Sequence, residues 1–178
     1  MKKITGLASL LVMCLLIPAF VWADATVSIV PAEIQSPEVG ATFNVDVEIN
    51  GVESLFGYTL KLTYDPTAVS FSSAKNSDFL PGAFAMDPIE KENSVEYNVT
   101  MLGGNAVDGD GVLATFEFEV LEVKESTLEL DVTLSDDMAE EIPAITGNAQ
   151  IAVEQVQREP VIPEHESGSK VLTLEGVY

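Results

Sequence analysis

Residues 56–66 read Phe-Gly-Tyr-Thr-Leu-Lys-Leu-Thr-Tyr-Asp-Pro, and this stretch decides the fold class. Large apolar side chains occupy every second position from Phe56 to Tyr64, and small or polar residues lie between them. Alternation with a period of two predicts a strand that buries one face and exposes the other. Asp65-Pro66 ends this strand, because proline has no amide hydrogen for the ladder and Asx-Pro pairs initiate turns.

The same alternation recurs along the chain, and no window shows the 3.6-residue period of a helix. The segments that alternate are 27–29, 43–50, 56–64, 69–71, 95–101, 112–120, 128–134 and 151–153, with a ninth strand expected near 79–84. Within 112–120 we place Val112 inward and Leu113 outward. Turn residues separate the segments, including Asn50-Gly51 and Asp108 to Gly111. Many short strands with turns between them predict an all-β fold, a jelly-roll β-sandwich of about nine antiparallel strands.

The first 23 residues have the pattern of an export signal. Lys2 and Lys3 give a positive start, and residues 7–17 form an apolar run that is shorter than the roughly 20 residues needed to span a bilayer. We expect cleavage after Ala23 and a secreted protein, either extracellular or periplasmic, with no membrane attachment after cleavage. Residues 24–153 then form the sandwich domain, and the acidic, proline-containing residues 154–178 form a flexible tail.

The mature chain is strongly acidic and has no cysteine. Cys14 is the only cysteine, and it leaves with the signal together with two lysines, so the net charge changes from −21 to −23. No disulfide can form, and stability must come from the packed core. A polyanion repels nucleic acid and anionic membranes, which excludes both as expected partners, and self-repulsion favours a monomer.

The composition offers no catalytic machinery and no metal site built on Cys or His. His165 is the only histidine and lies in the predicted tail, so a base-assisted nucleophile is not expected. With 29 acidic residues, some pair must lie at glycosidase spacing by chance, and the spacing of carboxylates therefore predicts nothing. We expect a protein that is not an enzyme and that has no catalytic residues and no cofactor of its own.

Two features leave alternatives open. Asp108-Gly-Asp-Gly resembles the start of a calcium loop, but the twelfth position is Glu119, an outward strand residue, so we predict a turn and keep a weak calcium site at Asp108 and Asp110 as the alternative. Phe79 and Phe84 are the only aromatic pair that could form an exposed sugar-binding platform, and we expect them to pack instead.

The order of several short motifs resembles that of a bacterial cohesin domain over about residues 26–153. The motifs are Val39 to Val45, Val52 to Tyr58, Leu60 to Pro66, Ala68 to Phe71, Leu80-Pro-Gly82, Gly109 to Phe118 and Leu128 to Asp136. The resemblance implies a nine-stranded jelly-roll sandwich that binds a dockerin module through one flat sheet face. Dockerins carry calcium in duplicated EF-hand-like loops and are often attached to polysaccharide-degrading enzymes, so calcium is expected on the partner.

The resemblance also implies which residues bind. The partner-binding positions map to the outward side of two strands and the loop after the second: Gly57, Thr59, Lys61, Glu96, Asn98, Thr100, Leu102 and Gly103. The best-studied cellulosomal cohesins have an Asn and an Asp where this chain has Gly57 and Thr59. A carbohydrate-binding module of the same superfamily, which would bind polysaccharide, is the alternative function. A self-assembling sandwich that adds residues 171–178 to a neighbour's sheet edge is a further one.

Overall fold

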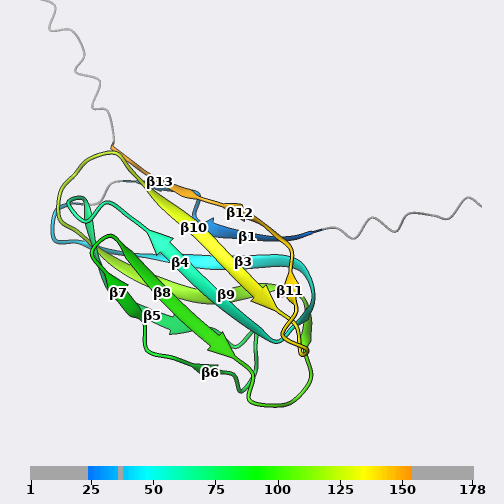
Figure 1. The fold of residues 1–178 in the computed structure, drawn as a ribbon. Helices are drawn as coiled ribbons and strands as arrows, with labels where there is room; N and C mark the ends of the chain where they lie inside the picture. Colours follow the sequence, from blue (N-terminus) through cyan, green and yellow to red (C-terminus); the bar gives the residue numbers. More distant parts are fainter. Residues whose placement is uncertain (1–23, 36–37, 154–178) are drawn as a thin grey trace, which may run out of the picture.

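A computed structural model describes residues 24–35 and 38–153. The predicted export signal (1–23) and tail (154–178) lie outside the described residues. The described part contains thirteen strands in two sheets packed face to face, which confirms the β-sandwich (Figure 1). No helix long and apolar enough to cross a membrane occurs in these residues.

The two sheets differ in size. The five-stranded sheet has the order β12 (Ala144–Gly147), β1 (Ala25–Val30), β3 (Thr42–Leu55), β9 (Val107–Val120) and β5 (Val69–Asn76). The eight-stranded sheet has the order β2 (Glu33–Gln35), β13 (Ala149–Ala152), β10 (Ser126–Ser135), β4 (Gly57–Thr63), β8 (Ser94–Thr100) and β6 (Phe84–Ala85), with β11 (Glu141–Ile142) on β10 and β7 (Ile89–Lys91) on β8. Two pairs are parallel, β1 with β12 and β13 with β2, and the others are antiparallel.

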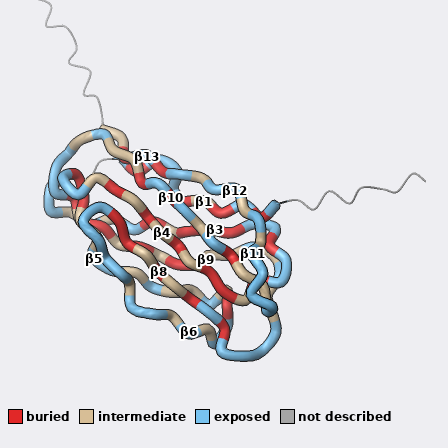
Figure 2. Tube along the Cα trace, in the orientation of Figure 1, coloured by how far each residue is buried: buried red, intermediate tan, exposed pale blue. Residues whose placement is uncertain are grey.

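The core fills the space between the sheets. Buried and less buried positions alternate along β4 and β8 (Figure 2), as the period-two pattern predicts. Phe116 and Phe118 of β9 have no exposed surface and meet aromatic rings of the other sheet. The ring centroids of Phe118 and Tyr64 lie 5.3 Å apart, and those of Phe116 and Tyr97 lie 6.0 Å apart. Both pairs pack edge to face. These contacts join the two sheets.

Two of the predicted turns are wrong, because they lie inside strands. Asn50-Gly51 falls within β3 and the segment from Asp108 to Gly111 falls within β9. These strands pair with each other, and their register shifts where Ile49 and Val52 face Gly111 and Gly109. Gly51 has a φ of 70° and Gly109 a φ of 109°. A β-bulge and a turn can both require a glycine in this region, so the local sequence does not distinguish them.

The placement of Leu113 on the outward side is also wrong. Val47 pairs with Ala114 while Glu48 pairs with Val112, so Leu113 is an extra residue without a partner in β3. The bulge turns the Leu113 side chain into the core, where it has no exposed surface, and leaves Val112 only half-buried.

The backbone carbonyl of Leu113 links the two sheets. The Tyr58 hydroxyl on β4 donates to this oxygen at 2.7 Å. Asn76 Oδ1 lies 2.6 Å from the same hydroxyl oxygen. The Ser77 backbone N–H donates to the Leu113 carbonyl as well, at 3.1 Å. A buried hydroxyl without a partner would be costly, and here it is satisfied from the opposite sheet.

The Asp65-Pro66 turn after β4 forms as predicted. The Asp65 carboxylate accepts hydrogen bonds from the Thr67 backbone N–H at 2.9 Å and the Thr67 hydroxyl at 2.7 Å. The Lys124 ammonium lies 2.7 Å from the other carboxylate oxygen. Hydrogen bonds from Lys124 and Thr67 hold the pKa of Asp65 well below its usual range. The contact fastens the end of β4 to the segment that precedes β10.

The expected ninth strand near 79–84 is reduced to the two residues of β6. Phe79 lies outside it and packs against the core, and a Cβ atom at Gly111 would lie 2.3 Å from its ring. Glycine at position 111 therefore makes room for this ring. Phe84 differs from expectation, because 52% of its surface is exposed. The two aromatics do not form a shared platform.

The aromatic core can be tested by truncation. Phe116→Ala should lower the free energy of unfolding by about 3–5 kcal/mol, because a fully buried ring is replaced by a cavity. Phe84→Ala removes the same ring from an exposed site and should cost less than about 0.5 kcal/mol. Urea unfolding of both variants measures the difference, and equal midpoints would contradict the assignment of Phe116 to the core.

The link from Tyr58 to Leu113 can be tested with pH. Tyr58→Phe should cost about 1–2 kcal/mol near neutral pH, since the Leu113 carbonyl keeps only its Ser77 partner. Burial, with a smaller contribution from Tyr97, raises the pKa of Tyr58 above its ordinary value of 10.0. Above pH 10 the unfolded chain therefore loses this proton while the folded chain keeps it, and stability falls.

Tyr58→Phe should accordingly make the alkaline loss of stability shallower, by up to about 1.4 kcal/mol per pH unit. Urea unfolding between pH 8 and pH 11.5 compares the two proteins. A parallel pair of pH curves would show that Tyr58 titrates as it does in the unfolded chain.

Candidate partner-binding face

The register of β4 and β8 brings six of the eight predicted binding residues onto one surface. They form three directly opposed pairs: Gly57 with Thr100, Thr59 with Asn98 and Lys61 with Glu96. The residues that alternate with them on β4, Tyr58, Leu60 and Leu62, are buried in the core. The six therefore lie on the outer side of the eight-stranded sheet, as the alternation predicts.

The remaining two residues lie beyond the end of β8. Leu102 and Gly103 belong to the segment between β8 and β9, and 76% of the Leu102 surface is exposed. Gly103 has a φ of 141°, a conformation that L side chains rarely adopt. This segment extends the surface at the end where Thr100 lies.

Strand β10 supplies the other side of the surface, which the binding positions chosen from the sequence omit. Ser135 pairs with Gly57, Thr133 with Thr59 and Asp131 with Lys61. The outer residues of β4 and β8, together with these three residues of β10, form what we call the candidate face, at the front of Figure 1. The alternation over 128–134 predicts a strand with outward polar residues. It does not show that this strand neighbours β4, because strand order in a sheet is not a local property.

Hydrogen bonds connect side chains across the candidate face. The Thr59 hydroxyl donates to Asn98 Oδ1 at 2.6 Å, and Asn98 Nδ2 donates to Glu96 Oε1 at 3.2 Å. Lys91 of β7 lies 3.6 Å from the other carboxylate oxygen of Glu96. The chain of contacts restricts the rotamers of Thr59 and Asn98, so these residues are partly ordered before any partner binds.

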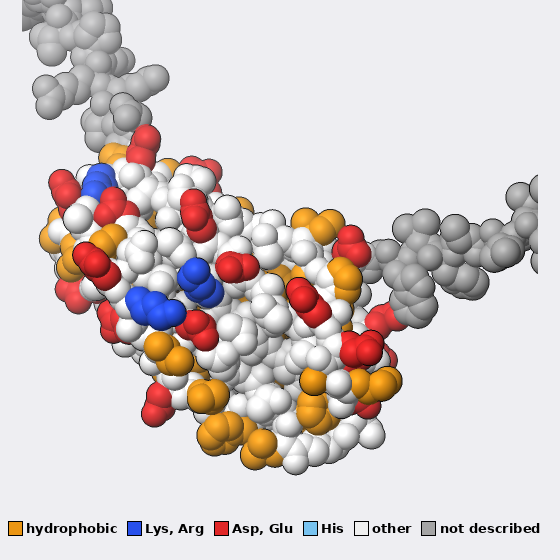
Figure 3. Space-filling model, viewed as in Figure 1, with side chains coloured by type: hydrophobic (Ala, Val, Ile, Leu, Met, Phe, Trp, Pro, Cys, Tyr) orange, Lys and Arg blue, Asp and Glu red, His pale blue; other side chains and the backbone are white. Residues whose placement is uncertain are grey.

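An exposed apolar strip borders the face along β6 and β7. Phe84, Met86 and Ile89 have 52%, 49% and 45% of their surfaces exposed, and we call these three residues the apolar edge. Phe84 pairs with Thr100 and Ile89 pairs with Glu96, so the apolar edge adjoins the candidate face directly. Figure 3 shows apolar side chains gathered along this border, next to a surface that carries both lysines and acids. Exposed apolar groups that cluster in this way mark interaction sites.

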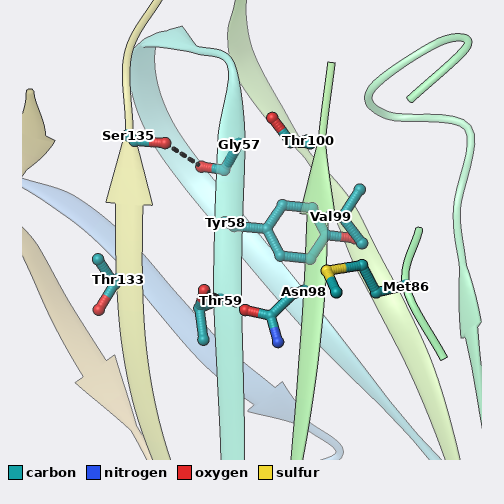
Figure 4. Close-up of a pocket in the computed structure, with 9 residues that line it drawn as sticks. All are labelled: Gly57, Tyr58, Thr59, Met86, Asn98, Val99, Thr100, Thr133 and Ser135. Atoms are coloured by element: carbon teal, nitrogen blue, oxygen red, sulfur yellow. Dashed lines mark hydrogen bonds between the residues drawn. The ribbon is translucent and has the colours of Figure 1, made fainter. Parts of the chain in front are cut away.

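The candidate face is hollowed above Gly57, at the end where Thr100 and Ser135 lie (Figure 4). The hollow has a volume of about 180 Å³. It is lined by residues of β10, β4 and β8 and by Met86: Gly57, Tyr58, Thr59, Met86, Asn98, Val99, Thr100, Thr133 and Ser135.

Comparison with known proteins assigns the chain to a family. The model of the Cohesin domain family matches residues 27–151, which is most of the sandwich. The chain belongs to the cohesin family. A comparison with curated proteins finds no match.

Solved structures share the fold at low sequence identity. A non-cellulosomal cohesin from the archaeon Archaeoglobus fulgidus is 18% identical with a TM-score of 0.63, over 76% of this chain and 94% of that one. The seventh ScaB type I cohesin from Pseudobacteroides cellulosolvens is 21% identical with a TM-score of 0.57, over 80% and 98%. The sixth cohesin of scaffoldin B from Acetivibrio cellulolyticus, solved in complex with a Cel5 dockerin, is 15% identical with a TM-score of 0.60, over 74% and 100%.

The carboxylates of Asp108 and Asp110 in this cohesin accept hydrogen bonds from backbone N–H groups. Asp110 Oδ1 accepts from the Gly51 N–H at 2.6 Å, and Asp108 Oδ1 accepts from the Ser54 N–H at 2.7 Å. Within residues 24–35 and 38–153, no three Asp, Glu, His or Cys side chains gather in a way that could hold a metal ion. The two carboxylates hold the irregular end of β3 against β9, away from the candidate face.

Proposed function

We propose that this cohesin is an exported, non-catalytic module that docks a dockerin-bearing protein through the candidate face. The observation that carries the proposal is the register of β4 with β8, which aligns Gly57, Thr59 and Lys61 with their three partners on one outer surface. The sheet gives a broad surface of the kind that accepts another folded module. A specific interface of standard size buries about 1,600 Å² in total, with most of its affinity from a few central residues.

Family membership and composition support a binding role. The Cohesin family model covers most of the sandwich, and several solved structures of the same fold are complexes of a cohesin with a dockerin. The chain has a single histidine and no cysteine beyond residue 14. It therefore offers few of the side chains that activate a nucleophile or bind zinc. We propose that the module takes part in assembling extracellular polysaccharide-degrading or surface complexes as a monomer. The polysaccharide-binding alternative loses its proposed platform, since Phe79 is packed against the core.

The proposed function predicts calcium-dependent binding that a charge reversal on the eight-stranded sheet weakens. Lys61→Glu places a third acid between Glu96 and Asp131 and should weaken binding to a dockerin from the same genome by at least about tenfold. Lys75→Glu makes the same charge change on β5 of the other sheet and should leave the affinity within about twofold. Isothermal titration calorimetry with calcium and with a chelator measures both effects.

Three results would contradict the proposed function. These are the absence of calcium-dependent binding to every dockerin of that genome, equal losses for the two lysine variants, or binding to insoluble polysaccharide instead of dockerins. The last result would favour the carbohydrate-binding alternative.

Export can be tested separately. We expect the chain expressed with its own leader in a Gram-negative host to leave the cytoplasm and begin at Asp24, because the predicted cleavage site follows Ala23. Intact-mass spectrometry of the periplasmic and culture fractions measures the N-terminus. A product that keeps residues 1–23 and stays with the membrane would contradict the assignment.

A further inference from the structure

Gly57 is the first residue of β4, and its backbone does not require glycine. The glycines with positive φ are Gly40, Gly51, Gly82, Gly103, Gly104 and Gly109, and Gly57 is not among them. Other residues could therefore adopt its extended conformation. Glycine within a strand weakens it, and it often marks a site where a ligand or another chain approaches closely.

The missing side chain of Gly57 creates the hollow. A Cβ atom at this position would lie 3.2 Å from Ser135 Oγ, 3.2 Å from the Val99 carbonyl oxygen and 3.3 Å from Thr100 Oγ1. These distances are tighter than most contacts of a Cβ atom, so any other side chain would push its neighbours aside and fill the space. Figure 4 shows the hollow between Thr133 and Ser135 on one side and Thr100 and Met86 on the other.

The walls of the hollow carry no charge. Lysine, arginine, aspartate and glutamate are absent from its lining, although the chain has a net charge of −21. Tyr58 and Val99 have buried side chains and contribute their backbone. The ionisable groups of the face, Lys61, Glu96 and Asp131, lie one or two rungs away. An uncharged site with the charged groups set apart from it is typical of the part of an interface that loses its water.

Several polar groups of the lining already have partners. The Thr59 hydroxyl donates to Asn98 at 2.6 Å, and the Ser135 hydroxyl donates to the Gly57 carbonyl oxygen at 3.3 Å. Beside the Ser135 and Thr100 hydroxyl oxygens that border Gly57, an incoming side chain meets the Gly57 Cα and the thioether of Met86. A methionine side chain adapts its shape to a neighbour. Met86 also belongs to the apolar edge, so the hollow continues into an exposed apolar surface.

We propose that the hollow above Gly57 receives one short, uncharged, branched aliphatic side chain from the dockerin-bearing partner. Gly57 is then the residue that determines which side chain the partner must present there. The identity of the partner rests on the proposed function, whereas the chemistry of the hollow stands on its own lining. A charged side chain would lose its water without gaining an opposite charge inside the hollow.

A small probe tests the hollow without any partner. Isobutanol imitates the side chain, and glycerol is a control of similar size that has a hydroxyl group on every carbon and no methyl group. In ¹H–¹⁵N spectra of the mature protein, isobutanol should shift the amide signals of Gly57, Thr100 and Ser135. The concentration needed is on the order of 100 mM, because so small a probe binds weakly. Glycerol should not shift them, and Thr133→Phe, which fills the hollow from an exposed site, should abolish the isobutanol shifts.

Unshifted amides around Gly57, or equal shifts with isobutanol and glycerol, would overturn the aliphatic pocket. The thermal midpoint of Thr133→Phe should match that of the unmodified protein, because Thr133 is exposed.

The dockerin completes the test. Thr133→Phe should weaken dockerin binding by at least about tenfold, whereas Thr127→Phe should change it by less than about twofold. Thr127 is the same residue type on the same strand and lies about 20 Å away, at roughly 3.3 Å per residue. Equal effects of the two variants would overturn the pocket as a binding determinant. Isobutanol shifts without binding to any dockerin would overturn the proposed function, and with it the dockerin as the source of the side chain.

Discussion

The hydrogen bond from the Tyr58 hydroxyl to the Leu113 carbonyl oxygen is the constraint on which the arrangement of this cohesin depends. It joins β4 in one sheet to β9 in the other at a distance of 2.7 Å. The carbonyl is in reach because a bulge at Leu113 inserts a residue that has no partner in β3. The same bulge turns the Leu113 side chain into the core. One irregular residue thus supplies both an apolar side chain and a polar acceptor between the sheets.

The position of β4 decides the position of the candidate face. Tyr58 points into the core from the strand whose opposite side carries Gly57, Thr59 and Lys61. Successive side chains of a strand alternate between its two sides. The inner contacts that hold β4 in place therefore also fix the position and the pairing register of its outer residues. Asp65, bound by Lys124 and Thr67, holds the end of the strand. These contacts restrict β4 before any partner binds, which reduces the entropy lost on binding.

Much of the fold could be predicted from the period-two pattern, and three of the errors arise where β3 and β9 pair irregularly. Asn50-Gly51 and Asp108 to Gly111 were predicted as turns and are parts of β3 and β9. Glycine with a positive φ serves a turn and a bulge equally well, so only the pairing of the two strands distinguishes them. Leu113 was placed on the wrong side because it is an extra residue in the pairing with β3, and one extra residue reverses the alternation locally.

The sequence by itself determined the fold class, the strand ending in Asp65-Pro66 and the side of that strand on which Gly57, Thr59 and Lys61 lie, because alternation and turn chemistry are local. The order of the motifs also carried the family resemblance. Only the tertiary structure decided that β10 lies beside β4, that Thr133 and Ser135 therefore face Gly57, and that a hollow opens there beside Met86. Strand order and the space left by a missing side chain depend on residues distant in the chain, and a pattern read along the chain does not contain them.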